Sequence, residues 1–204
     1  MSIRAVITDF GGVLYNPPDR RWMRRWQFWL RLGKDEFISS VLADPEGSEY
    51  VRKVYTGEIP EAEVWARFGM RWHVSSWMVN RMRRGGFSSK RYNREMAGFI
   101  QGLRPRYKTA ILSNAGDQGR QIFGEAYAIE SLVDLVIISA EEKLAKPDER
   151  IYRLALDRLG VQADEAVFID DLEVNVQASR LLGIHTVHFH NTAQAIAEVQ
   201  HYLG

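Results

Sequence analysis

The residues of this sequence best suited to chemistry are acids that follow apolar runs. Asp9 comes directly after IRAVIT, and Asp170 and Asp171 come directly after AVFI. Carboxylate oxygens are ligands that Mg²⁺ prefers, and an aspartate can also attack phosphorus to form an aspartyl-phosphate. Because acids held close together repel one another, a bound divalent cation would stabilise their ionised forms.

A hydroxyl, an amide and an ammonium group occupy similar places. Ser113 and Asn114 follow the run TAIL, and Lys146 stands just before Pro147, where a helical pattern begins. A lysine and a serine hydroxyl can hold phosphate oxygens. Taken singly, each has an ordinary explanation, since Ser and Asn are frequent in turns and Asp often caps a helix. Their shared placement at the ends of apolar runs favours one common site.

The elements that must position these groups alternate along the chain. Short apolar runs rich in β-branched residues predict buried strands, and helical patterns separate them. This alternation predicts an α/β fold in which helices cover both faces of a parallel sheet. Ligands bind outside the carboxyl ends of such strands, so the groups above would meet in one crevice. The predicted strands are 3–10, 108–115, 132–140, 166–171 and 185–190, and the predicted helices are 93–104, 117–127, 147–160, 173–183 and 192–204.

Residues 16–87 break the alternation with helical patterns and no strand pattern. The stretch starts at the turn-like NPPD and ends at RRGGF, which has the composition of a hinge. We predict a helical insertion over 16–87 and a core formed by 1–15 and 88–204. All the tryptophans lie in the insertion: Trp22, Trp26, Trp29, Trp65, Trp72 and Trp77.

The first helix of the insertion, RRWMRRWQFWLR, has two interpretations. One face carries tryptophans and the other carries arginines and a glutamine, which is typical of a packed apolar stripe with solvated charges. Interleaved basic and aromatic residues also occur where proteins bind single-stranded nucleic acid or a membrane surface. An arginine reaching toward a bound phosphate is a further alternative. The first face is Trp22, Trp26 and Trp29, and the second is Arg20, Arg24, Gln27 and Arg31.

Composition narrows the class of protein. A chain of 204 residues fits one domain with a sizeable insertion. The absence of cysteine excludes disulfides, thiolate catalysis and cysteine metal sites. A net charge of +1 gives no general attraction to nucleic acid or membranes, and neither a signal-peptide pattern nor a membrane-spanning run is present. We expect a cytoplasmic protein without a nucleic-acid or membrane partner, and the oligomeric state stays unknown.

Four segments in this order resemble the motifs of a known family. ITDFGGVL, ILSNA, KLAKPDERIY and VFIDDLEVNVQAS are similar to the four motifs of the haloacid dehalogenase-like (HAD) superfamily, most of whose members are magnesium-dependent phosphatases. The resemblance covers the whole chain, and the insertion resembles a cap of the first, helical class (C1). It implies a Rossmann-like three-layer α/β/α core with an inserted helical cap.

The resemblance also implies a magnesium site. Asp9 would be the nucleophile and a metal ligand, and the backbone carbonyl of Gly11 would be a second ligand. Asp171 would bind Mg²⁺ directly and Asp170 mainly through water.

For the phosphate, the resemblance implies four further residues. Ser113 and the backbone around Asn114 would bind the phosphoryl group of a small phosphorylated substrate. Lys146 would neutralise the nucleophile and the transferring group, and Asn175 would support this network.

Gly11 departs from the family pattern. Most members have an Asp there, which protonates the leaving alcohol and then activates water. The chain resembles the branch with DxG in its first motif, which includes sugar-phosphate phosphatases and relatives of the epoxide hydrolase N-terminal domain. We predict a phosphatase that favours good leaving groups, such as acyl or anomeric sugar phosphates. The alternatives are a non-catalytic phosphate-binding or regulatory protein and a 2-haloacid dehalogenase, although adjacent Asp170 and Asp171 favour phosphoryl transfer.

The histidines add two weaker hypotheses. His188 and His190 share one face of the last predicted strand, with His185 on the other, and imidazoles can bind zinc. His73 in the insertion is a candidate for the missing acid, but the sequence does not say where it lies.

Overall fold

The core of the molecule is a parallel sheet of five strands. The structure is a computed structural model of the chain. It describes residues 2–16, 20–30, 45–71, 73–86 and 91–204. The strands pair in the order β3–β2–β1–β4–β5, so β1 is central. Their bounds are β1 Ala5–Thr8, β2 Lys108–Ser113, β3 Leu135–Ile138, β4 Ala166–Asp170 and β5 His185–His188.

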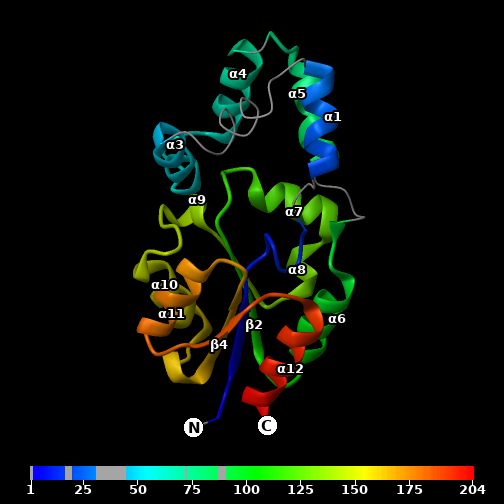
Figure 1. Cartoon of the computed structure of the whole chain (residues 1–204). Coiled ribbons are helices and arrows are strands. Elements are labelled where there is room, and N and C mark those ends of the chain that lie inside the picture. The colour runs from blue at the N-terminus through cyan, green and yellow to red at the C-terminus, as the bar shows by residue number, and fades with distance from the viewer. Residues whose placement is uncertain (1, 17–19, 31–44, 72, 87–90) are drawn as a thin grey trace.

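Both faces of the sheet are buried, as the continuous apolar runs predict. Along β1, Val6 contributes to one core cluster, while Ala5 and Ile7 contribute to the other. Helices α6 and α12 cover the first face, and α10 and α11 cover the second (Figure 1). The predicted three-layer α/β/α architecture is therefore confirmed.

Helix ends in the core follow the sequence signals. Asn93 and Asp148 cap α6 and α10 with their side chains, and α10 ends at Gly160, whose φ is 61°. Asn191 forms a capping box with Gln194 at the start of α12. The predicted helices correspond to α6 Arg94–Leu103, α7 Gly119–Tyr127, α10 Glu149–Leu159, α11 Glu173–Leu181 and α12 Thr192–Leu203.

The predicted strand 132–140 is wrong at both ends. Only Leu135–Ile138 is extended; the short helix α8, Ile129–Leu132, precedes it and α9, Ser139–Glu142, follows it. The Asp134 carboxylate accepts hydrogen bonds from the backbone N–H and the hydroxyl of Thr109, which fixes the chain before the strand. The Ser139 hydroxyl bonds to the backbone of Ala115, which turns the chain after it.

The insertion lies beyond the carboxyl ends of the strands (Figure 1). Its described helices are α1 Arg20–Leu30, α3 Pro45–Tyr55, α4 Glu61–Arg71 and α5 Ser76–Gly86, and its described residues contain no strand. The RRGG part of the expected hinge is instead the last turn of α5, while Phe87 and residues 17–19 lie outside the described residues. The division into a core of 1–15 and 88–204 and a cap of 16–87 stays a prediction. No described helix has the length and apolar character needed to cross a membrane.

Helix α1 agrees with the predicted stripe only in part, since Arg24 is exposed and Trp26 is partly buried as predicted. Gln27, expected in solvent, is buried at 9% exposure, whereas Trp29, expected in the packed face, is 67% exposed. Phe28 is 82% exposed, so the buried side of α1 is centred near Gln27. Periodicity shows that a helix has two faces, but the neighbouring elements decide which one packs. Trp72, Arg31 and the side chains of Arg20 and Trp22 lie outside the described residues.

Candidate active site

The predicted site residues meet where the central strands end. Asp9 follows β1, whose two neighbours are β2, ending in Ser113, and β4, ending in Asp170. Ser113 is buried at 3% exposure, and no residue in the described part of the chain hydrogen-bonds to its hydroxyl. A hydroxyl in that position is available to a ligand at the sheet edge.

Lys146 links two of the acids. Its Nζ lies 2.9 Å from Oδ1 of Asp9 and 2.7 Å from Oδ2 of Asp170, and its side chain is 1% exposed. The Asn114 side chain holds the Lys146 backbone, accepting from its N–H at 2.9 Å and donating to its carbonyl at 2.8 Å. Since this amide is occupied, only the backbone of Asn114 is left for a substrate, and the side chain positions the ammonium group.

Asp170 is fully buried and fully engaged. Besides Lys146, its carboxylate accepts from Nδ2 of Asn175 at 3.1 Å and from the backbone N–H of Leu172 at 2.8 Å. Asn175 therefore lies beside the acid pair, where the resemblance put a supporting residue. Because its carboxylate already accepts several hydrogen bonds, Asp170 is suited to holding its neighbours in place rather than to contacting a substrate.

Asp171, in contrast, has an open carboxylate. Within the described residues its oxygens form no ion pair and no side-chain hydrogen bond. Gly12 approaches it with a φ of 81°, and a Cβ on Gly12 would lie 2.1 Å from Oδ2 of Asp171. Only glycine fits there, because any side chain would push Asp171 away.

His188, which the sequence offers as a zinc ligand, also fixes this loop. Nε2 of His188 lies 3.0 Å from the backbone carbonyl of Asp171 and therefore donates to it, while Nδ1 lies 3.0 Å from Oε2 of Glu173. The register that pairs His188 with Asp170 causes this contact. Within the described residues, the one metal-like cluster of acids and histidines is that of Asp9, Asp170 and Asp171.

These three acids fit a magnesium ion by their chemistry. One carboxylate oxygen from each lies within 4.8 Å of the others, and hard oxygen donors suit Mg²⁺. Burial raises the pKa of Asp9 to about 7, with the Asp170 charge adding to the effect and Lys146 opposing it. Burial and the Asp170 charge also raise the pKa of Asp171. The cluster thus carries an electrostatic cost that a cation would relieve.

The space at position 11 is open. A Cβ built on Gly11 would meet no atom within 4 Å, and the backbone there is not in the left-handed region. The missing acid therefore leaves room for a substrate, water or another side chain.

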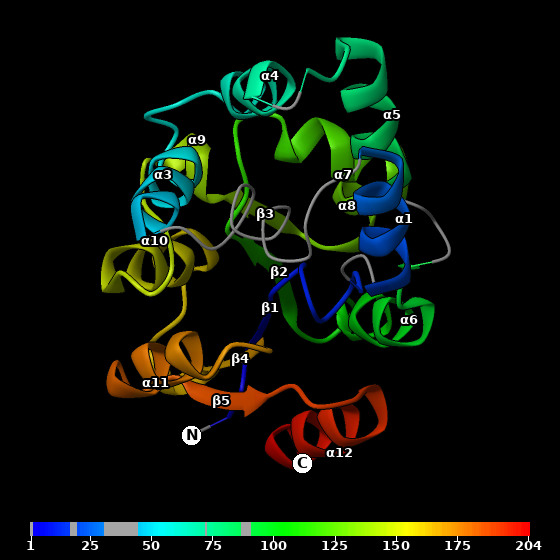
Figure 2. The same ribbon diagram turned by 45° about the horizontal axis from the view of Figure 1, so that its top comes forward.

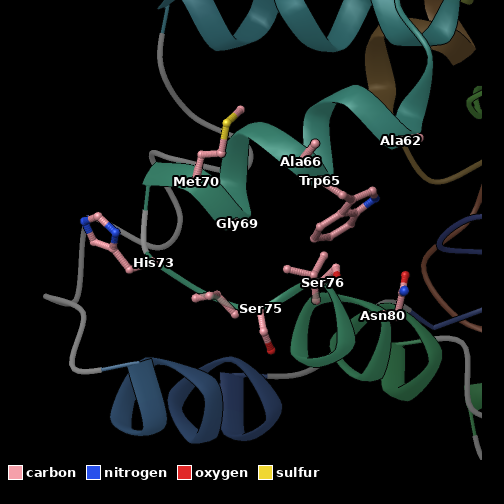
Figure 3. Close-up of a pocket in the computed structure, with 11 residues that line it drawn as sticks. Ala62, Trp65, Ala66, Gly69, Met70, His73, Ser75, Ser76 and Asn80 are labelled. Carbon is pink, nitrogen blue, oxygen red and sulfur yellow. The ribbon is translucent and has the colours of Figure 1, made fainter.

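His73, proposed as a replacement acid, lies elsewhere. It is exposed and lines a cavity of about 800 Å³ between α4 and α5, together with Trp65, Met70 and Val79. Figure 3 shows His73 at the connection between these helices, with Trp65 pointing across the cavity toward α5. His73 is not among the residues that contact Asp9 in the described part of the chain.

Comparison with known proteins finds similarity to one superfamily of hydrolases. A haloacid dehalogenase-like hydrolase family model matches residues 90–183. A predicted HAD-like hydrolase from Porphyromonas gingivalis superposes with a TM-score of 0.77 and 24% identity, over 100% of this chain and 98% of that one. An HAD-family enzyme from Bacteroides thetaiotaomicron, solved with magnesium and inorganic phosphate, gives 0.72 and 22%, over 91% and 93%. The chain is thus similar to haloacid dehalogenase-like hydrolases in sequence over residues 90–183 and in fold over its whole length.

The curated proteins that this chain resembles in sequence are larger than it is. Acyl-CoA dehydrogenase family member 10 from Mus musculus is 28% identical over the whole chain, which spans 19% of that protein. Bifunctional epoxide hydrolase 2 from Sus scrofa is also 28% identical over the whole chain, which spans 39% of it. (S)-2-haloacid dehalogenase 4A from Burkholderia cepacia is 35% identical over 81 residues, or 40% of this chain and 35% of the dehalogenase.

Proposed function

We propose that this chain is a HAD-like hydrolase, and specifically a magnesium-dependent phosphatase for a small phosphorylated metabolite. The observation that carries the proposal is the arrangement of Asp9, Asp170 and Asp171, with Lys146 between two of them and one acid open. The magnesium and phosphate bound by the Bacteroides thetaiotaomicron enzyme support it. Among the ligands, the Gly11 backbone carbonyl would join Asp9 and Asp171, with Asp170 acting mainly through water.

Each residue has a role in the proposed reaction. An oxygen of Asp9 attacks phosphorus, forming an aspartyl-phosphate while the bond to the leaving oxygen breaks. Ser113 and the backbone at Asn114 orient the phosphoryl oxygens, and Lys146 balances their charge. Asn175 keeps Asp170 in place. Magnesium, when bound, supplies positive charge that stabilises the transferring phosphoryl group.

The leaving group is where this protein differs from the usual family pattern. General acid and base assistance contributes about 10²- to 10⁴-fold to a reaction, and Gly11 supplies none. Positioning and charge stabilisation remain, so turnover is reduced most for alkyl esters, whose leaving oxygen needs a proton. Acyl phosphates and anomeric sugar phosphates need less help and are the favoured substrate class.

We further propose that the helical segment 16–87 acts as a cap. Caps close over HAD-type sites, exclude water and select the substrate. The cavity between α4 and α5 gives this segment apolar surface for the rest of a substrate. The substrate proposed is a small molecule, with no nucleic-acid or membrane partner and with a cytoplasmic location.

A dehalogenase is the second candidate, and one observation favours it. The Burkholderia cepacia relative has the highest identity of the proteins compared above, and halide leaves without a proton, as a site with Gly11 requires. The acids at Asp170 and Asp171 argue for the phosphatase, because metal-free displacement of halide gives them no role. A phosphate-binding protein without turnover remains the non-enzymatic alternative.

One experiment separates these functions. A panel of phosphate esters, acetyl phosphate and 2-haloacids is assayed with Mg²⁺ and with a chelator, using wild type, Asp9→Asn and Asp157→Asn. Asp157 is an exposed acid on α10 that is not part of the cluster, and it serves as the control. We expect phosphate release that needs Mg²⁺ and Asp9 and is unaffected in the control. Halide release without metal supports the dehalogenase, and phosphate binding without turnover supports the binding protein.

A further inference from the structure

The segment between α3 and α4 packs against the connections that follow β2 and β3. Helix α3 ends at Tyr55, and Gly57 follows with a φ of 67°. A Cβ on Gly57 would lie 2.5 Å from the backbone oxygen of Ala140 in α9, so this turn touches the connection after β3. Figure 2 shows α3 beside α9.

The same segment touches the connection after β2. The backbone N–H of Glu61 donates to Oδ1 of Asp117 at 2.9 Å. A Cβ on Gly116 would lie 3.1 Å from Oε2 of Glu61 and 3.2 Å from Cγ1 of Val54. Gly116 is only three residues beyond Ser113, at the proposed phosphate site. Contacts on either side of Tyr55 thus hold it above the ends of β2 and β3.

The electrostatics of Tyr55 agree with this position. Its side chain is half-buried, and burial raises the pKa of its hydroxyl. The charges of Asp9 and Glu61 raise that pKa further, and the charge of Lys146 lowers it. Because its pKa is raised, the hydroxyl stays protonated. No described residue accepts a hydrogen bond from it.

We propose that Tyr55 is the proton donor that partly replaces the acid missing at position 11. This inference rests on the proposed phosphatase function. The open space at Gly11 and the half-buried Tyr55 hydroxyl would face the leaving oxygen of a substrate whose phosphorus meets Asp9. A phenol is a weaker acid than a carboxylic acid, so the replacement is partial.

The proposed proton transfers balance. In the first step Asp9 forms a bond to phosphorus, the bond from phosphorus to the leaving oxygen breaks, and the Tyr55 O–H proton moves to that oxygen. In the second step water attacks phosphorus, the bond to Asp9 breaks, and the water's proton returns to the Tyr55 oxygen. The products are the alcohol, phosphate and the starting protein.

The test measures how rate depends on the leaving group. kcat/KM is determined with Mg²⁺ for aryl phosphates of graded phenol acidity, an alkyl phosphate and acetyl phosphate. We expect Tyr55→Phe to lose about 10- to 100-fold on the alkyl phosphate and less than about twofold on acetyl phosphate. Tyr50→Phe is the matched control, because Tyr50 is on the same helix and its buried hydroxyl has no hydrogen-bond partner among the described residues.

A second set of variants, made in the Gly11→Asp protein, distinguishes a catalytic role of Tyr55 from a structural one. Adding Gly11→Asp gives the leaving oxygen another proton donor, so Tyr55→Phe should cost less on that background. Tyr55→His, which restores a donor, should recover part of the loss. Equal losses on alkyl and acetyl phosphate, or no loss on either, overturn the role of Tyr55 while leaving the phosphatase intact. Absence of any magnesium-dependent turnover in the wild type instead overturns the proposed function, and this inference with it.

Discussion

At the scale of single residues, two adjacent glycines have opposite roles. Gly12 has no room for a side chain, because a Cβ would collide with the Asp171 carboxylate. Gly11 has open space and an ordinary backbone conformation. Steric hindrance therefore does not account for the missing acid at position 11, and an aspartate can be introduced there.

Gly11→Asp tests what that position contributes. We expect kcat/KM for an alkyl phosphate to rise by about 10- to 100-fold, because a carboxylic acid can protonate the leaving oxygen. Acetyl phosphate should change little, so the dependence of rate on leaving-group pKa becomes flatter than in the wild type, while Tyr55→Phe makes it steeper. Steady-state kinetics over the same ester series measures both.

The control is Gly98→Asp, which adds the same charge at an open, exposed position on α6. It should leave the whole series unchanged. A Gly11→Asp variant that binds Mg²⁺ but keeps the wild-type slope would show that a proton donor is not what limits this site.

At the scale of elements, the turn between α3 and α4 contacts the core, and in our proposal this contact positions Tyr55. Gly57 is required at this contact both by its positive φ and by the nearby Ala140 carbonyl. Gly57→Ala should cost about 1–2 kcal/mol from the left-handed backbone alone, and the clash with Ala140 adds to this.

We therefore expect Gly57→Ala to lower Tm and to reduce kcat/KM for alkyl phosphates more than for acetyl phosphate, because the shifted turn carries Tyr55. Gly102→Ala is the matched control, since its Cβ meets nothing within 4 Å on α6. It should stabilise by about 0.5–1 kcal/mol, the usual gain at a helical glycine. Thermal unfolding and kinetics on the ester series check both variants. Equal Tm values for the two would contradict the close contact between Gly57 and Ala140.

Contacts between residues distant in sequence also limit how much of this structure the sequence can predict. Period and flanking signals located the five strands and the core helices, because a buried strand or a capped helix is encoded in neighbouring residues. Asp9, Lys146 and Asp170 were predicted to meet because parallel strands bring their carboxyl ends to one edge. Tyr55 was missed because its place depends on Gly57 and Ala140, which are distant in sequence. The places of Gln27 and Trp29 on α1 were predicted wrongly because they too depend on neighbouring elements.

At the scale of the whole molecule, we expect the acid cluster to link stability to pH and to magnesium. The pKa of Asp9 is raised from 3.8 to about 7, and that of Asp171 is raised as well. A carboxyl group with a raised folded-state pKa binds protons more readily in the folded state than in the unfolded state. Its contribution to stability is therefore complete below about pH 4 and is lost as the pH rises through about 7.

Without metal, we thus expect the cluster to lower Tm between pH 5 and pH 8, and Mg²⁺ to reverse this most strongly at pH 8. Saturation at about 100 times Kd corresponds to roughly 2.7 kcal/mol, or about 5–10 °C for a protein of this size. The stabilisation is measured at each pH as the difference between Tm in Mg²⁺ and Tm in chelator. Ionisable groups remote from the cluster affect both Tm values equally, so their effect cancels in this difference. Asp171→Asn should remove most of this difference and raise Tm in chelator at pH 8, whereas Asp157→Asn should leave both unchanged. A magnesium-dependent gain that is the same at pH 5 and pH 8, or that survives Asp171→Asn, would mean that the cation stabilises the protein at another place than this cluster.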